Sequence, residues 1–322
     1  MQLDPARWEE LPRPVGFVLS GGATLGALQV GMLRALAAAG IRPDLVAGTS
    51  VGALNGAVLA DVGLPGPAAH VLDATWRAMS TATVFPGGRL RQAWRLARRR
   101  SVYPDTGLRH IISSSLGPDP TFEGLSLPFA AVATDVLGGF PAAFARGDLT
   151  RPLLASAAIP GLLPTQVVDG RPCWDGGVTA NVPLRAALAL GSRSLVVLDA
   201  GDICQREIAP DGGAASTLAA MSTAIRQRVL IEVAQVAEET PVLYLARPCV
   251  TGRAPLSFAS TPALLRDGEA TAAAFLSDAP VPVPGTLVGE PHSHRVDDPS
   301  HGEDHAPTFV RGMPDDRRAY GS

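Results

Sequence analysis

A serine stands between two glycines in the sequence GTSVG, residues 48–52. An apolar run precedes Ser50 and a helix-like run follows it, so the serine lies where a buried strand would turn into a helix. Gly48 and Gly52 allow the sharp turn that exposes a nucleophile's hydroxyl. The N-terminus of the following helix also directs free N–H groups toward the serine oxygen. The motif predicts a nucleophile; a plain small-residue helix start is the alternative.

A serine nucleophile needs a base, and the histidines are poorly placed to supply one. Four of the six lie beyond residue 290, in a polar segment that is not expected to hold a fixed geometry. His70 precedes every plausible acid, whereas α/β-hydrolases follow the order serine, acid, histidine. Such hydrolases also place several strands before the nucleophile, and only one or two precede Ser50. Either the chain is not a hydrolase or its base is a carboxylate.

The sequence WDGG, residues 174–177, offers that carboxylate. Asp175 follows a short predicted strand and precedes Gly176 and Gly177, which would present the side chain at a loop tip close to other backbone. Asp-Gly is also a favoured hairpin dipeptide. On these residues alone, an ordinary turn and a general base remain equal alternatives.

The sequence SGGATLG, residues 20–26, follows the first predicted strand. Small residues between a strand and a helix expose backbone N–H groups, which can hold an oxyanion or a phosphate. A dinucleotide-binding loop is the competing interpretation. The GxGxxG spacing fails at Ala23, and no acidic residue ends a strand about 20 residues later, because Asp44 begins its strand.

The elements around these motifs alternate between strands and helices. Strands are predicted at 15–19, 44–48, 129–136, 141–146, 194–200 and 241–246, with a hairpin in 166–177, and helices at 25–40, 51–63, 151–159, 214–239 and 262–278. Strand–helix alternation with short connections indicates an α/β fold, with a mostly parallel central sheet covered by helices on both faces.

The 322 residues are predicted to form one domain over 10–278, after a short extension at 1–9. From 279 to 322 the chain is rich in Pro, His and Asp, and we expect a disordered tail. Residues 74–104 contain seven arginines and no acidic residue. Within them, the amphipathic pattern of 87–100 is that of a basic helix lying on an anionic membrane, or of a solvated helix covering the core.

Composition narrows the class of protein. The net charge of −3 gives no indication of a nucleic-acid partner. Cys173, Cys204 and Cys249 fit neither a disulfide framework nor a metal-ligand spacing, which favours a reducing compartment. The N-terminus lacks the apolar core of a signal peptide, and no apolar run reaches the roughly 20 residues of a transmembrane helix. We expect a cytoplasmic protein, with peripheral membrane contact left open.

Taken together, the motifs resemble those of the patatin-like phospholipases. A glycine-rich loop follows strand one, GxSxG follows strand two, and DGG follows the segment ASAAIPGLLP at 155–164; the resemblance spans about residues 15–200. The sequence DGGVTANVPLRAAL, 175–188, also matches the family's style. The resemblance implies a Ser–Asp dyad that hydrolyses an acyl ester of a lipid through an acyl-serine intermediate, without a metal or organic cofactor.

The resemblance also implies a role for each motif residue. Ser50 becomes the nucleophile and Asp175 the general base. The N–H groups of Gly22 and Ala23 form the oxyanion hole, while Gly21 shapes its turn. The remaining motif glycines are Gly26, Gly48, Gly52, Gly176 and Gly177.

Two positions depart from the family pattern: Ala23 replaces a third glycine, and Leu25 replaces a cation. Alanine keeps its N–H, so the hole survives if the backbone angles suit a β-carbon. The departures permit one alternative, a catalytically silent lipid-binding or regulatory protein, and acyl transfer to an acceptor other than water is the alternative among enzymes. A free Asp, with a pKa near 3.9, is also a poor base, so partial desolvation of Asp175 beside Trp174 is expected to raise that pKa.

Overall fold

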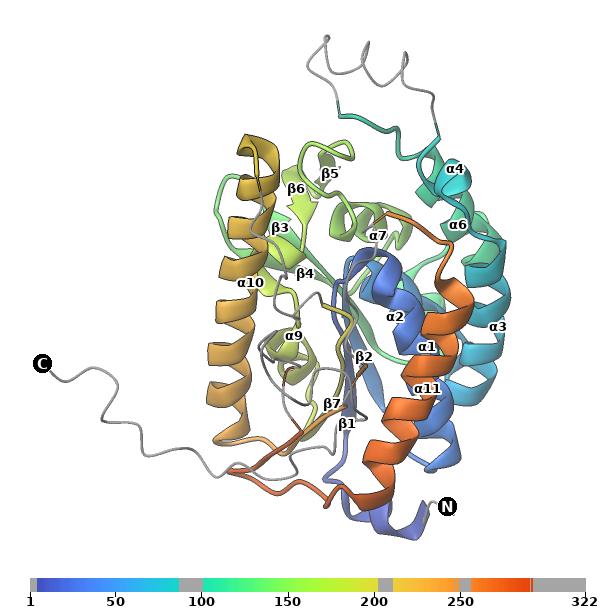
Figure 1. The fold of residues 1–322 in the computed structure, drawn as a ribbon, viewed down its shortest axis with the longest axis vertical. Helices are drawn as coiled ribbons and strands as arrows, with labels where there is room; N and C mark the ends of the chain where they lie inside the picture. The colour runs from blue at the N-terminus through green and yellow to red at the C-terminus, as the bar shows by residue number, and fades with distance from the viewer. Residues whose placement is uncertain are drawn as a thin grey trace, which may run out of the picture.

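The structure is a computed structural model that describes residues 5–86, 101–201, 211–245, 247–248, 256–289 and 291. A central sheet stands between two layers of helices (Figure 1). The arginine-rich stretch 87–100 and most of the expected tail lie outside the described residues.

The described residues form a nine-stranded sheet in the order β5-β6-β3-β2-β1-β7-β8-β9, and β4 also pairs with β3. Its strands are β1 (Val15–Leu19), β2 (Leu45–Thr49), β3 (Phe129–Asp135), β4 (Pro141–Phe144), β5 (Gln166–Val168), β6 (Arg171–Asp175), β7 (Ser194–Leu198), β8 (Val242–Tyr244) and β9 (Leu287–Val288). The run from β3 to β9 is parallel, whereas β4, β5 and β6 form antiparallel pairs.

Helices cover both faces of this sheet, and every residue of β1, β2 and β7 is buried. The α-helices are α1 (Gly26–Ala38), α2 (Val51–Val62), α3 (Pro65–Ala78), α4 (Thr81–Val84), α6 (Thr106–Leu116), α7 (Thr150–Ser156), α8 (Gly177–Ala180), α9 (Leu184–Ala189), α10 (Gly213–Ala237) and α11 (Thr261–Asp278), and three short 3₁₀ helices are η1 (Pro5–Glu10), η2 (Ala23–Leu25) and η3 (Phe122–Gly124). In Figure 1, α1, α3 and α11 lie on one side of the sheet and α10 on the other. Strands buried on both faces read as unbroken apolar runs, which is why the sequence predicted the fold class correctly. None of the described helices has the length and apolarity to span a membrane.

Both ends of the domain lie further out than the sequence predicted. At the N-terminus, Trp8 on η1 and Leu11 are buried in the main core, so the folded part begins before residue 10. At the other end, β9 pairs in parallel with β8 and Val288 is buried. The expected boundary at 278 is therefore too early. A two-residue strand among prolines carries no periodic signal, although it covers the edge that β8 would otherwise expose.

Candidate active site

Ser50 occupies a strained turn between β2 and α2. Its φ of 54° and ψ of −126° are unusual for a residue with a side chain. The first turn of α2 packs directly on the end of β1, because a β-carbon at Gly52 would lie 2.3 Å from the carbonyl oxygen of Leu19. Strain of this kind persists only where surrounding contacts fix the backbone, and it is characteristic of functional sites. The structure thus has the turn that GTSVG predicted.

The register of β3 brings Ser50 and Asp175 together. Val132 of β3 pairs with Thr49, and the next residue, Ala133, pairs with Asp175. Strand β4 pairs with the residues of β3 on both sides of this point, so β2 and β6 must share the opposite edge of β3. The two strands run toward each other along that edge, and their last residues, Thr49 and Asp175, meet end to end. Residues 125 positions apart in the chain therefore come into direct contact.

The side chains of Ser50 and Asp175 form a hydrogen-bonded pair. Ser50 Oγ donates to Asp175 Oδ2 at 2.6 Å, and the Gly177 N–H donates to Oδ1 at 2.7 Å. Exposed fractions are only 7% for the serine and 6% for the aspartate. Burial raises the pKa of Asp175 to about 6, and the two hydrogen bonds oppose this rise. The direction is the one expected from the sequence, and it makes the carboxylate a stronger base that is still ionised at neutral pH.

A second serine, Ser156 at the end of α7, ties the two segments together. Its hydroxyl accepts the N–H of Ser50 at 2.8 Å and donates to the carbonyl of Val132 at 2.6 Å. Its own carbonyl accepts the N–H of Gly176 at 3.2 Å. Sequence reasoning missed this residue. The available signal was a serine in the otherwise apolar stretch LLASAAI, at the end of a predicted helix.

The glycine-rich loop lies beside Ser50. A β-carbon at Gly21 would lie 3.2 Å from the β-carbon of Ser50, and the Gly21 N–H is already bound to the carbonyl of Asn181 at 3.0 Å. The N–H groups of Gly22 and Ala23 are therefore the candidates for an oxyanion. Ala23 takes the left-handed conformation, with φ 48°, which costs a non-glycine residue about 1–2 kcal/mol.

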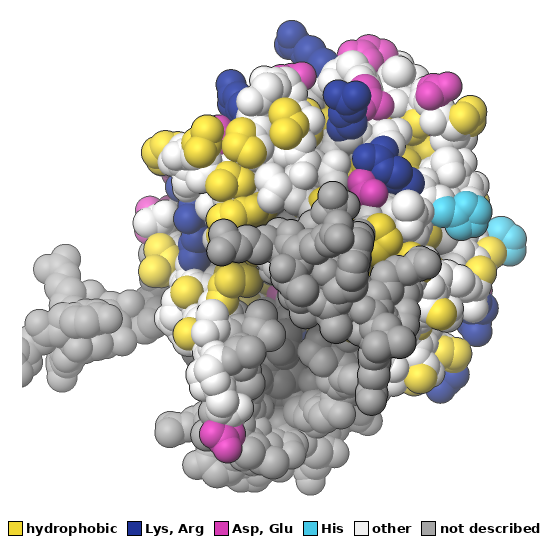
Figure 2. Space-filling view, turned by 90° about the horizontal axis from the view of Figure 1, so that it is seen from above, with side chains coloured by type: hydrophobic (Ala, Val, Ile, Leu, Met, Phe, Trp, Pro, Cys, Tyr) yellow, Lys and Arg dark blue, Asp and Glu magenta, His cyan; other side chains and the backbone are white. Residues whose placement is uncertain are grey.

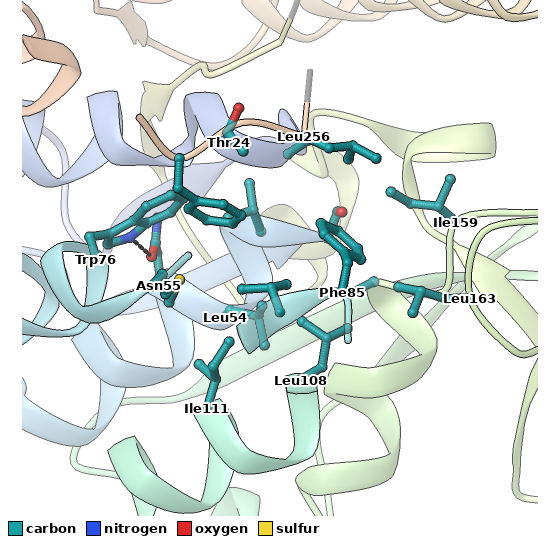
Figure 3. Close-up of a pocket in the computed structure, with 17 residues that line it drawn as sticks. Thr24, Leu54, Asn55, Trp76, Phe85, Leu108, Ile111, Ile159, Leu163 and Leu256 are labelled. Atoms are coloured by element: carbon teal, nitrogen blue, oxygen red, sulfur yellow. Dashed lines mark hydrogen bonds between the residues drawn. The ribbon is translucent and has the colours of Figure 1, made fainter. Parts of the chain in front are cut away.

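A buried polar network holds both ends of this loop. Gln29 Nε2 donates to the Ser20 carbonyl at 2.9 Å, where the loop begins, and Asn55 Nδ2 donates to the Gly26 carbonyl at 3.0 Å, where it ends. Asn55 Nδ2 also reaches Gln29 Oε1 at 2.9 Å, and Trp76 Nε1 donates to Asn55 Oδ1 at 3.0 Å (Figure 3). Buried polar side chains of this kind are satisfied only in one arrangement, so the network specifies the loop's position. The sequence analysis did not identify it.

An apolar pocket opens next to Ser50 and Ala23. Its side chains come from several elements: Leu108 and Ile111 rise from α6, while Trp76 projects from α3 (Figure 3). The lining residues are Ala23, Thr24, Ser50, Val51, Leu54, Asn55, Trp76, Met79, Val84, Phe85, Leu108, Ile111, Ala157, Ile159, Leu163, Leu256 and Phe258. The apolar lining suits a hydrocarbon group, with the polar end of the ligand at Ser50.

The two histidines among the described residues take no part in the site. His70 on α3 and His110 on α6 are exposed, and the hydrogen bonds described for Ser50 go to Asp175, Ser156 and its own helix. Leu25, where the family has a cation, packs against the main core instead.

Comparison with known proteins gives a consistent family. The family model for patatin-like phospholipases matches residues 17–188. Patatin-like phospholipase domain-containing protein 7 of Mus musculus is 28% identical over 219 residues, which cover 63% of this chain and 15% of that protein. Lysophospholipase NTE1 of Mycosarcoma maydis is 30% identical over 200 residues, which cover 59% of this chain and 10% of its own.

This chain therefore spans only a small part of the length of these curated relatives. The crystal structure of VipD from Legionella pneumophila superposes with a TM-score of 0.46 at 15% identity, covering 82% of this chain and 67% of that one. The family model alone covers more than half of the sequence. The chain belongs to the patatin-like phospholipase family.

Proposed function

We propose that this protein is a serine hydrolase that cleaves an acyl ester bond of a lipid through an acyl-Ser50 intermediate. The observation that carries the proposal is the 2.6 Å hydrogen bond from Ser50 Oγ to Asp175 Oδ2 beside an apolar pocket. A nucleophile already bonded to its base at the end of an apolar cavity suits a long acyl chain with its carbonyl at the hydroxyl.

The reaction begins when Ser50 Oγ attacks the carbonyl carbon and its proton passes to Asp175 Oδ2. The carbonyl oxygen becomes an oxyanion that accepts hydrogen bonds from the Gly22 and Ala23 N–H groups. The tetrahedral intermediate collapses, the bond to the leaving alcohol breaks, and protonated Asp175 returns the proton to that alcohol. Water then attacks the acyl-Ser50 ester with Asp175 again as base, which releases the fatty acid and restores the serine.

The raised pKa of Asp175, about 6, supports this use of a carboxylate. A base works best when its pKa lies near the working pH, and burial brings an aspartate close to the value usual for histidine. The oxyanion donors add to the rate enhancement that the base supplies, because a single such donor contributes a factor of about 10²–10³. Their direction depends on the loop that Gln29 and Asn55 hold, which assigns those two residues a positioning role.

The relatives named lysophospholipases favour a lipid with a single acyl chain, and one apolar pocket beside the serine is consistent with that substrate. The preformed dyad favours catalysis over a silent lipid-binding role. Transfer of the acyl group to another acceptor uses the same first half-reaction, and product analysis distinguishes it from hydrolysis.

A fluorophosphonate probe tests the proposal, since it labels a serine only where a base and an oxyanion hole activate it. We expect one equivalent of label on the peptide that contains Ser50, and none in Ser50→Ala, which should also lose esterase activity but keep its melting temperature. Ser113→Ala, which changes an exposed serine on α6, is the matched control and should label normally. Ester hydrolysis that survives in Ser50→Ala would refute the assignment.

A further inference from the structure

Two strongly exposed apolar side chains stand on one tight turn. Leu137 is 84% exposed and Phe140 is 70% exposed, and both lie in the turn that joins β3 to β4. They are the most exposed large hydrophobic residues in the part of the chain that the structure describes. Single exposed apolar residues are common on protein surfaces, but a pair three positions apart at a tip is a feature that calls for a partner.

The turn is held rigidly in this exposed position. Asp135 Oδ1 accepts the N–H groups of Leu137 and Gly138, each at 3.0 Å. The Asp135 carbonyl accepts the N–H of Gly139, and its N–H donates to the carbonyl of Phe140, both at 2.9 Å. Since four hydrogen bonds centre on one aspartate, the exposure of the two side chains is a property of the folded turn and not of a frayed loop.

A third exposed apolar residue stands on the neighbouring hairpin. The N–H of Val136 donates to the carbonyl of Pro172 on β6 at 2.9 Å, and Pro172 pairs with Val167 on β5. Val167 is 56% exposed. It lies two strand spacings, or about 10 Å, from the base of the turn. We call Leu137, Phe140 and Val167 the apolar tip.

The apolar tip projects from the end of the sheet that carries the site. Asp175 pairs with Ala133, two residues before β3 ends at Asp135, so the turn begins about 7 Å beyond that pair along β3. Figure 2 looks at this end of the molecule, where hydrophobic side chains gather along one side, with basic and acidic side chains interspersed nearby. The tip and the apolar pocket beside Ser50 therefore lie at the same end of the sheet.

We propose that the apolar tip is a membrane-docking surface whose side chains insert among the acyl chains of a lipid layer. The inference rests on the proposed function: the pocket suits an acyl chain, and such a chain is found in a lipid aggregate rather than in free solution. Inserting the tip brings the end of the sheet that carries Ser50 against that aggregate. The exposed charges beside it, Asp169 and Arg171, are of opposite sign. Binding should thus depend on apolar burial, with little contribution from anionic lipids.

The test is co-sedimentation with vesicles of pure phosphatidylcholine, carried out in the Ser50→Ala background so that no hydrolysis alters the lipid. We expect the double variant Leu137→Ser/Phe140→Ser to bind at least tenfold more weakly than its parent. Raising the salt from 0.1 M to 1 M should not weaken the parent's binding, because screening acts on charges and not on apolar burial. Phe140→Trp should bind as well as the parent or better, since an indole ring suits the membrane interface.

Ile231→Ser provides the matched control. Ile231 is 58% exposed on α10, near the helix end that leads into the start of β8, and so lies at the opposite end of the sheet. The Ile231→Ser variant should bind vesicles as tightly as the parent does. The docking surface is refuted if the parent does not bind neutral vesicles, if the double variant binds equally well, or if Ile231→Ser loses as much.

Two further readouts separate this inference from the proposed function and from a protein partner. In the Ser50 form, the double variant should keep its turnover of a short soluble ester but lose turnover of a lysophospholipid carried in phosphatidylcholine vesicles. Loss of binding together with intact soluble-ester hydrolysis supports the tip, whereas vesicle binding without any hydrolysis contradicts only the proposed function. Light scattering should show the same mass for parent and double variant. A change of oligomeric state would identify the tip as a contact between protein copies and overturn the inference.

Discussion

The two sides of Ser50 are built from different interactions. On the side of Asp175, Ser156 and the glycine-rich loop, directional hydrogen bonds of 2.6–3.0 Å fix each polar group. On the other side, the apolar pocket is formed by side chains that only pack together. A hydrogen bond is either made or lost, whereas packing can be altered by degrees. Substitutions on the polar side should therefore change the rate sharply, and those in the pocket should change the choice of substrate gradually.

The largest effect is expected at the base. Asp175→Asn keeps the shape of the side chain but cannot accept the serine proton, so kcat/KM should fall by about 10⁴-fold, as when the acid of a serine triad is changed to Asn. Steady-state hydrolysis of a p-nitrophenyl ester measures it. Asp169→Asn, in an exposed turn, is the control and should stay active. Substantial activity in Asp175→Asn would show that another group is the base.

Ser156→Ala should have the next largest effect. It removes the acceptor of the Ser50 N–H and the donor to the Val132 carbonyl, so both backbone groups lose this partner. We expect kcat to fall by about 10–10²-fold with KM little changed, because the nucleophile is displaced and the pocket is not. Ser156→Thr keeps the hydroxyl and should restore part of the rate. Equal losses in both variants would indicate that size, and not the hydrogen bonds, matters at this position.

The pH dependence should follow the pKa of Asp175, about 6. Because the base must be ionised, kcat/KM should fall about tenfold for each pH unit below 6 and reach a plateau above 7. The stability of the fold should change with pH in the opposite direction from the activity. Burial favours the protonated form in the folded state, so the free energy of unfolding should fall as pH rises from about 4 to 6, by up to about 3 kcal/mol.

Asp175→Asn removes this cost and gives a second test. The inactive variant should melt at a higher temperature than the parent at pH 8, with the difference shrinking below pH 6 and vanishing near pH 4. Thermal unfolding of both proteins across this range measures it. A parent that is more stable at pH 8 would mean that the hydrogen bonds to Asp175 outweigh its desolvation.

The smallest effect is expected in the pocket. Ile159→Ala removes apolar contact at a partly exposed lining position, so it should disturb the fold little. Across a series of esters, kcat/KM should rise with chain length in the parent, by up to about fourfold for each buried methylene. The variant should lose a few fold with long esters and nothing with the acetate. A uniform loss at every chain length would show that Ile159 affects the rate of the reaction and not the choice of substrate.

The sequence predicted the polar side only where the signal is local. The turn at Ser50 can be predicted from the five consecutive residues 48–52, and Asp175 is followed by glycines that allow it to approach β3. Ser156 was missed because its function arises from contact with a residue 106 positions away. Asn55 was missed for a similar reason, since a polar residue inside a helical pattern gives no indication of which carbonyl it reaches.

The fold shows the same division. The strands of the parallel core were predicted within a residue or two, because their unbroken apolar runs are distinctive. Helix α3 was missed although Pro65 marks its first turn, a position where proline is favoured. Strand β9 could not have been found, since two residues have no period and only the open edge of β8 explains their conformation.

The shared edge of β3 fixes the distance between the two reacting side chains, because β2 and β6 both pair with it. The separation of Ser50 and Asp175 is measured in residues of β3, from the partner of Thr49 to the partner of Asp175, and not by the length of chain between them. Insertions in the connections before β3 or between β3 and β6 can thus alter what surrounds the pocket without moving the pair. Adding one residue within β6 would instead slip its register and turn the carboxylate to the other face of the sheet. This architecture leaves the surroundings free to diverge while the reacting atoms stay in place.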